Sequence, residues 1–308
     1  MYSYRVAGLS VRSEIDLPGL IATTPDSSEA DVLIAPGAVP KELDTPAASG
    51  PTWAISGDRF LLRIPDVARF LLTAGREIMF ETENGTPSND IAIFLIGTVL
   101  GILLHQRERI VLHASGIWVN GKAVLFCGAS GAGKSTIAAA LGQRGYPLVT
   151  DDLCAIAFAD DAKPIAHPDG RQLKLWAKAL ERLGLNEDRG ARVRDQLEKY
   201  YVEPADAFSE PLPIGAVYAL REARPPHDVG IEQPNIVDAA LLMRSNAYRP
   251  LLVRRMAQRA NYFRAATAIA NAAGVYFLTR HLNFGTMPDV IAALERHWGE
   301  IGLTGNVS

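Results

Sequence analysis

One stretch of the chain, GASGAGKST from Gly128 to Thr136, has a residue order that dictates a chemistry. It matches the phosphate-binding loop pattern G-x-x-x-x-G-K-[ST]. An apolar run that predicts a strand, Ala123–Cys127, precedes the loop, and a run of good helix formers, Thr136–Leu141, follows it and ends near Gly145. Strand, glycine loop and helix are the context that the pattern requires, so the sequence predicts nucleotide binding.

The positions of the loop have separate expected roles. Glycines allow the backbone to wrap a phosphate chain, so that N–H groups and the helix N-terminus face the anion. Lys134 would reach the terminal phosphates of ATP, and Ser135 would hold Mg²⁺. The alternative is a glycine-rich turn without a ligand. The residues predicted to bind the nucleotide are Gly128, Ala129, Ser130, Gly131, Ala132, Gly133, Lys134, Ser135 and Thr136.

The composition excludes several classes of protein. With 308 residues and 48% hydrophobic content, the chain can bury a large core, and its net charge of −3 gives no general attraction to nucleic acid. The cysteines Cys127 and Cys154 lie in apolar stretches, which favours buried thiols in a reducing compartment. The N-terminus lacks a signal-peptide pattern, and the apolar run Ile91–Leu104 looks too short to span a bilayer. We expect a soluble cytoplasmic protein without a membrane partner.

Before the loop, the chain alternates in the way that strands do. Runs such as Tyr4–Val11 and Ala68–Phe80 predict strands, and polar stretches rich in Pro, Gly and Ser separate them. We therefore expect a small β-rich accessory domain over residues 1–86, followed by a P-loop domain over residues 87–308. The accessory domain is either a surface for a substrate or partner, or a sheet that only stabilises the rest.

The strand before the loop has a predicted antiparallel partner. Asn120-Gly121 separates two apolar runs, Ile110–Val119 and Lys122–Cys127, and this pair is a strong sign of a two-residue hairpin. In such a hairpin the numbers of paired residues add up to 241, so position 113 lies opposite position 128. His113 is then predicted to face the phosphates, although a histidine in a strand is more often a satisfied core residue.

Two acids follow the next predicted strand. Tyr146–Thr150 ends at Asp151 and Asp152, and acids at the end of a strand near a phosphate loop are placed to bind Mg²⁺ and to take a proton from an attacking hydroxyl. Both acids can act only if the strand ends there, because successive side chains of a strand point to opposite faces. An acidic turn without a catalytic role is the alternative.

The combination of His113 with Ala114-Ser115-Gly116, the loop Gly128–Ser135, Arg144-Gly145-Tyr146 and Asp151-Asp152 resembles the HPr kinase/phosphorylase family. The resemblance implies an α/β fold with a mixed P-loop sheet of the HPr-kinase C-terminal type, a small β-rich N-terminal domain and a homo-oligomer. It implies that His113 lies at the phosphates of ATP, that Asp151 activates a substrate serine, and that Asp152 supports the metal site with Ser135.

The chain also departs from that family. Its Glu-Ile-Arg-Gly type signature is absent after the acids, where this chain has Pro168-Asp169-Gly170-Arg171 and continues to Trp176. The layout is more similar to HPr-kinase-like proteins associated with ribosomally made peptides, especially lasso peptides. The resemblance therefore implies a peptide or small-protein substrate with an acceptor serine, such as a lasso-type precursor peptide, in place of HPr.

Several cations outside the loop are further candidates. Arg171 and Lys174 either supply positive charge to the transferring phosphate or lie on the surface of a first helical turn. A long helical segment is predicted to carry Arg249, Arg255 and Arg259, with the last two on one face, where they would grip an acidic peptide or remain solvated.

The sequence thus predicts a Mg²⁺-ATP-dependent serine kinase with Lys134, His113 and Asp151 as its catalytic residues, and with Arg171 near the nucleotide. Two other classes stay open. One is a nucleotide-gated module that binds a peptide without transfer, and the other is an HPr-type, small-molecule or carboxykinase-like enzyme, because such loops are shared.

Overall fold

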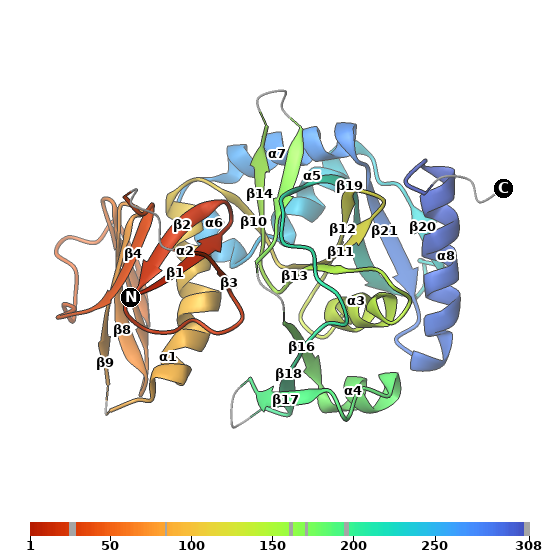
Figure 1. Cartoon of the computed structure of the whole chain (residues 1–308). Coiled ribbons are helices and arrows are strands. Elements are labelled where there is room, and N and C mark those ends of the chain that lie inside the picture. Colours follow the sequence, from red (N-terminus) through yellow and green to blue (C-terminus); the bar gives the residue numbers. More distant parts are fainter. Residues whose placement is uncertain (25–28, 84, 160–162, 170–171, 194–196, 305–308) are drawn as a thin grey trace.

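The structure, a computed structural model, describes residues 1–304 apart from 25–28, 84, 160–162, 170–171 and 194–196. The chain forms an N-terminal sheet, a central sheet with helices on both faces, and a small third sheet (Figure 1). The mixed α/β class and the β-rich N-terminal region are therefore confirmed. The predicted division between residues 86 and 87 stays a prediction.

The N-terminal sheet has the strand order β3-β1-β2-β4-β9-β8-β7-β6-β5. Two of its predicted strands are in fact hairpins, because Ala7-Gly8 and Ala74-Gly75 all have positive φ and form tight turns. The bounds are β1 (Tyr2–Val6), β2 (Leu9–Ser13), β3 (Ile21–Ala22), β4 (Val32–Pro36), β5 (Ala48–Gly50), β6 (Trp53–Ser56), β7 (Arg59–Ile64), β8 (Ala68–Thr73) and β9 (Glu77–Thr82).

A continuous helix follows this sheet, formed by α1 (Ser88–Phe94), the π-helical η1 (Leu95–Val99) and α2 (Leu100–Gln106). At 19 residues and a mean hydropathy of 1.6 it is long and apolar enough to cross a membrane, so the sequence argument from the length of the apolar run is wrong. Its side chains instead share a core with the N-terminal sheet, and every residue from 91 to 106 is buried or half-buried. This packing is consistent with the core helix of a soluble protein.

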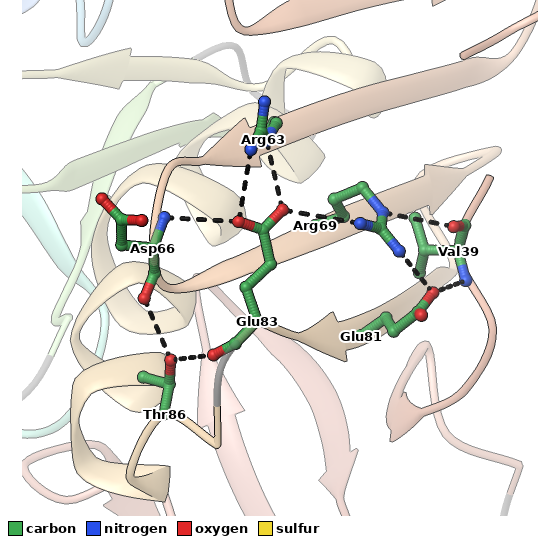
Figure 2. A network of polar contacts seen from close by, with 7 residues as sticks. All are labelled: Val39, Arg63, Asp66, Arg69, Glu81, Glu83 and Thr86. Carbon is green, nitrogen blue, oxygen red and sulfur yellow. Dashed lines mark hydrogen bonds and ion pairs between the residues drawn. The ribbon is translucent and has the colours of Figure 1, made fainter. Parts of the chain in front are cut away.

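A polar network on the outer face of the N-terminal sheet holds the entry to this helix (Figure 2). Glu83, just after β9, accepts hydrogen bonds from the side chains of Arg63 and Arg69 and from the backbone N–H of Asp66. Arg69 also pairs with Glu81 at 2.9 Å. The hydroxyl of Thr86 donates to the backbone carbonyls of Glu83 and of Asp66 in the turn between β7 and β8, so the residue two positions before α1 is tied to the sheet.

The central sheet has the order β10-β14-β15-β19-β12-β11-β13, with β21 beside β19 and β20 beside β21. β12, which leads into the loop, runs parallel to β19, and β19 runs parallel to β21. The carboxyl ends of these strands therefore lie at one edge. The bounds are β10 (Ile110–Leu112), β11 (Ala114–Val119), β12 (Lys122–Cys127), β13 (Leu148–Asp151), β14 (Cys154–Phe158), β15 (Pro164–His167), β19 (Leu212–Glu222), β20 (Gly230–Glu232) and β21 (Val275–Arg280).

Helices cover the two faces of the central sheet because its strands are apolar on both sides. On β12, Val124 and Phe126 pack with α3 (Lys134–Gly142) and α8 (Met287–Glu300), and the 3₁₀ turn η2 (Phe284–Thr286) precedes α8. Leu125 and Cys127 pack toward the other face, which carries α5 (Ile236–Ser245) and α7 (Arg259–Ala272).

The remaining elements correct two predictions. Lys174 lies on a strand of the small sheet and not on a helical turn. The predicted long helix is interrupted between α6 (Pro250–Arg255) and α7, where Ala257 has φ 57°, so Arg255 and Arg259 do not share one helix face. The small sheet has the order β16-β18-β17, with bounds β16 (Leu173–Trp176), β17 (Arg189–Arg192) and β18 (Lys199–Val202), and it continues into α4 (Ala177–Leu183).

Candidate functional site

The loop between β12 and α3 has the backbone that its glycines allow. Gly133, the residue before α3, has φ 88°, and Gly128 has φ 153°. A Cβ on Gly128 would lie 3.3 Å from the Cβ of Leu220 on β19, so a side chain would press the loop away from the sheet. Both glycines are therefore required by conformation, and Gly128 also by close packing.

Lys134 is held inside the loop. It is only 6% exposed, and its Nζ donates hydrogen bonds to the carbonyl oxygens of Gly128 at 2.9 Å and Ala129 at 3.1 Å. Burial lowers the pKa of this ammonium, although nearby acids oppose the effect. Its charge thus lies in a desolvated cradle where an anion would interact with it strongly. Residues 130–136 of the loop, apart from 132, line a cavity there together with His113, Asp152 and Lys174.

The hairpin before the loop has the predicted register. Asn120 and Gly121 form the turn with φ 45° and 81°, and β11 and β12 pair from Val119–Lys122 to Ala114–Cys127, where each pair adds up to 241. His113 lies one residue before this ladder, and it lines cavities with Gly128 and with Ser135. The structure therefore brings His113 to the loop, and its ring is 34% exposed there.

Asp152 is the acid that faces this cavity. Its Oδ1 lies 3.3 Å from Nε2 of His113, and its Oδ2 lies 3.2 Å from Nζ of Lys174. Burial alone would raise the pKa of Asp152, but the charge of Lys174 and the contact with His113 outweigh it and hold the pKa well below its ordinary value. Asp152 is thus an ionised carboxylate at the mouth of the loop.

Asp151 does not line this cavity, and its predicted role as base stays a prediction. It is 4% exposed, and its carboxylate accepts hydrogen bonds from the hydroxyl of Ser115 at 2.5 Å and from the backbone N–H of Lys174 at 2.9 Å. The reason is local backbone geometry. β13 ends at Asp151, and Asp152 adopts φ 90°, which separates the directions of the two side chains.

Asp169 is a residue that sequence reasoning did not assign to the site. Its carboxylate accepts from the backbone N–H groups of Asp151 at 3.2 Å and Leu153 at 3.3 Å, so it fixes the turn that aims Asp152. Burial raises the pKa of Asp169 to about 8, against the opposing contacts with Thr150 and Lys174. The signal in the sequence was the Pro168-Asp169-Gly170 turn, whose partner could not be read from the sequence.

Arg280 is the second such residue. It ends β21, is 5% exposed, and its Nη2 donates to the carbonyl of Ala132 at 2.5 Å while lying against Gly133. Among the described groups, nothing hydrogen-bonds to its buried Nε. Arg171, by contrast, was a prediction that falls outside the described residues.

A large cavity of about 1320 Å³ opens beside His113, Asp152 and Lys174. One wall comes from α1 and η1, and another from α5 and the segment after it. Basic side chains on its lining include Lys199, Arg221, Arg244 and Arg249. Of the cations predicted on the former long helix, Arg249 is the one that the structure brings to this cavity.

The residues present fit a magnesium–phosphate group. A hydroxyl and a carboxylate, from Ser135 and Asp152, line the same cavity as Lys134. Within the described ranges, no group of three or more His, Cys, Asp or Glu residues could hold a metal by itself. Mg²⁺ would therefore take its other ligands from phosphate oxygens and water, as is usual for this ion.

Strand, loop, helix and facing acid together have the arrangement of a P-loop α/β protein. No protein-family model matches the chain. Over 83 residues, or 27% of this chain, the sequence is 36% identical to HPr kinase/phosphorylase from Lachnoclostridium phytofermentans, and the match spans a quarter of that relative's length. This partial match supports an HPr-kinase-like family for the chain.

A solved structure gives a weaker likeness. The chain is similar to the HPr(Ser) kinase/phosphatase from Coxiella burnetii at 12% identity and a TM-score of 0.35, over 62% of this chain and 98% of that chain. A score of this size does not by itself establish a common fold. The fold class rests on the sheets described above, and the likeness to HPr kinase/phosphorylase rests on the matched 83 residues.

Proposed function

We propose that the chain is a Mg²⁺-ATP-dependent serine kinase that acts on a peptide or small protein. The observation that carries this proposal is the grouping of His113, Asp152 and Lys174 at the mouth of the loop that contains Lys134. A kinase needs cations and amide groups around the transferring phosphate and a proton acceptor beside the attacking hydroxyl. This site offers both.

The loop would hold the nucleotide. Its backbone N–H groups and Lys134 would bind the β- and γ-phosphates, and Ser135 and Asp152 would hold Mg²⁺. The bound metal would neutralise charge on the phosphate oxygens during transfer. The lowered pKa of Asp152 supports this assignment because an ionised carboxylate is a suitable ligand for a hard cation. Lys174 would add positive charge at the same point.

The structure changes the candidate for the proton acceptor. Both oxygens of Asp151 are engaged by Ser115 and Lys174 inside the protein, whereas the ring of His113 borders the cavity. His113 donates its backbone N–H to Asn246 and sets its ring edge against Tyr248, and both contacts fix its position. We therefore propose that His113 accepts the proton of the substrate serine and that Asp152 orients the ring of His113.

The size and charge of the large cavity support a peptide acceptor. Its volume of about 1320 Å³ exceeds the ~300–1,000 Å³ typical of small-molecule sites. Its basic lining residues favour an acidic segment beside the acceptor serine. A lasso-type precursor peptide is the acceptor that we propose. We also propose a cytoplasmic location, in line with the buried free thiols, and a homo-oligomer.

Mass spectrometry tests this proposal. The protein would be incubated with ATP and Mg²⁺ and offered HPr beside the short peptides encoded next to its gene. A mass increase of one phosphate on a serine of one of the peptides would support the proposal. Transfer to HPr alone, or to a metabolite, would point to the HPr-type or small-molecule alternative. Tight ATP binding without any phosphorylated product would indicate a nucleotide-gated binding module.

Substitutions separate the two acids and the histidine. We expect His113→Asn to slow transfer by roughly 10²–10⁴-fold, the usual range for a lost general base, with ATP binding retained. Asp151→Asn should lower the stability of the fold more than the rate. Loss of transfer in a folded Asp151→Asn protein, with His113→Asn still active, would show that the proton goes to Asp151.

A further inference from the structure

A second, smaller cavity shares no lining residue with the large cavity in which we propose that the peptide binds, here named the acceptor cavity. It has a volume of about 270 Å³ and is lined by residues at the ends of β20 and β21 and in the first turns of α8. Its apolar lining residues are Leu278, Val290 and Ala293, which are buried or half-buried, and the exposed Val229 at its rim. His281, Thr286 and Asp289 also line it, and His281 and Asp289 are exposed, so they lie toward solvent. An apolar slot with a few polar groups is the usual form of a small-ligand site.

Arg280 joins this cavity to the phosphate loop. The same side chain lines the cavity and donates its Nη2 hydrogen to the carbonyl of Ala132 in the loop. Strand register gives the same relation. Cys127, the last residue of β12 before the loop, pairs with Ala219, and Ala219 pairs with Phe277. Arg280 therefore lies three residues further along β21 than the residue that is level with Cys127.

The separation suits a nucleotide. β21 is two strands away from β12, which corresponds to ~10 Å across the sheet at ~4.8 Å per strand. A nucleoside triphosphate that places its terminal phosphates at Lys134 needs room for its base and ribose at a distance of this order. The acceptor cavity and this smaller cavity share no lining residue, so a nucleoside here leaves the acceptor cavity free for the peptide.

We propose that this cavity is the nucleoside site of the kinase, with the base of a purine nucleotide packed between Val290 and Ala293 on one side and Val229 on the other. Asp289 accepts a hydrogen bond from an exocyclic amino group of the base. Arg280, which lines the cavity and whose buried Nε has no hydrogen-bond partner among the described residues, supplies positive charge to the α-phosphate. This inference rests on the proposed function, because it requires that the loop binds a nucleotide.

A cavity-filling substitution tests the inference by binding and not by activity. Ala293, half-buried on α8, would be changed to Trp, and affinities for ATP and for inorganic tripolyphosphate would be measured by calorimetry with Mg²⁺. We expect Ala293→Trp to weaken the binding of ATP by roughly tenfold or more, which corresponds to about 1.4 kcal/mol of binding free energy. The affinity for tripolyphosphate should be unchanged. Ala268→Trp is the matched control, because Ala268 is a half-buried helical alanine that lines a different cavity.

Asp289→Ala provides a second variant that fills no space and lies at an exposed position. It should reduce the preference of the protein for ATP over purine riboside triphosphate, which lacks the exocyclic amino group. Unchanged ATP affinity in Ala293→Trp, or equal binding of ATP and tripolyphosphate by the unmodified protein, would overturn the nucleoside site and leave the kinase proposal standing. Binding of neither ligand would overturn both.

Discussion

The ion pair between Asp152 and Lys174 should contribute measurably to the free energy of unfolding. Their charged atoms are 3.2 Å apart, and the side chains are 29% and 17% exposed. At an effective dielectric of ~20 this separation gives an attraction of roughly 5 kcal/mol, which desolvation offsets in part. Removing one partner of such a pair costs about 3 kcal/mol, because the other charge stays buried.

We therefore expect Lys174→Met to lower the free energy of unfolding by about 3 kcal/mol at pH 7. Methionine keeps the length of the side chain and the backbone N–H that Asp151 accepts, so the substitution removes mainly the charge. Urea unfolding with an unchanged m-value measures the difference. Lys178→Met, at an exposed position on the neighbouring helix α4, is the control and should change stability little.

The pH dependence of the stability shows whether Asp152 is the partner of Lys174. The pKa of Asp152 is lowered in the fold, so its contribution is present above its unfolded pKa of ~3.9 and is lost as the pH falls toward the folded value. The pKa of Lys174 is raised, because the attraction of Asp152 exceeds the cost of burial, so the contribution persists up to alkaline pH. The difference in free energy of unfolding between the unmodified protein and Lys174→Met should narrow below pH ~4 by up to about 1.4 kcal/mol per pH unit. A gap that is the same at pH 3 and pH 7 would refute the reasoning.

Three further changes follow from single contacts. Gly133→Ala would place a methyl group against Arg280 and would put an alanine at φ 88°, where a residue with a side chain is strained. Calorimetry should therefore show weaker ATP binding in a protein that is still folded. Tyr262→Phe removes a buried hydroxyl that both donates to and accepts from the backbone of β10, and urea unfolding should show a loss of about 1–3 kcal/mol. Ser115→Ala removes a donor to the buried Asp151 and should cost about 1.5–3 kcal/mol in the same assay while kinase turnover remains; loss of turnover at unchanged stability would contradict the structural role of Asp151.

The approach of His113 to the loop could be predicted because one local signal fixed it. Asn120-Gly121 supplies the two left-handed residues that a two-residue turn needs, and a hairpin of that kind has one register. The Ala7-Gly8 turn gave no comparable signal, since alanine rarely adopts positive φ, and a hairpin there was read as a single strand.

The division of labour between Asp151 and Asp152 could not be predicted in this way. It depends on a positive φ at Asp152, and that conformation is held by Asp169, which lies 17 residues later and reaches the turn through the fold. Arg280 is still more remote from the loop in sequence. It contacts Ala132 only because β12, β19 and β21 run parallel and end together. Long-range packing of this kind leaves no periodic or local pattern.

The sequence left open whether the N-terminal part provides a surface for a substrate or only covers the rest, and the helix after β9 favours the first. Phe94 on α1 and Thr98 on η1 line the cavity in which we propose that the acceptor binds. The guanidinium of Arg249 donates to the hydroxyl of Thr98 at 2.6 Å, which joins this wall to the basic lining of the cavity. Because the other side of the same helix is packed into the N-terminal sheet, any change in that sheet would move a wall of the acceptor cavity. We infer that the N-terminal part selects the acceptor through this helix, so exchanging it between relatives should change the peptide that is phosphorylated while ATP affinity stays the same.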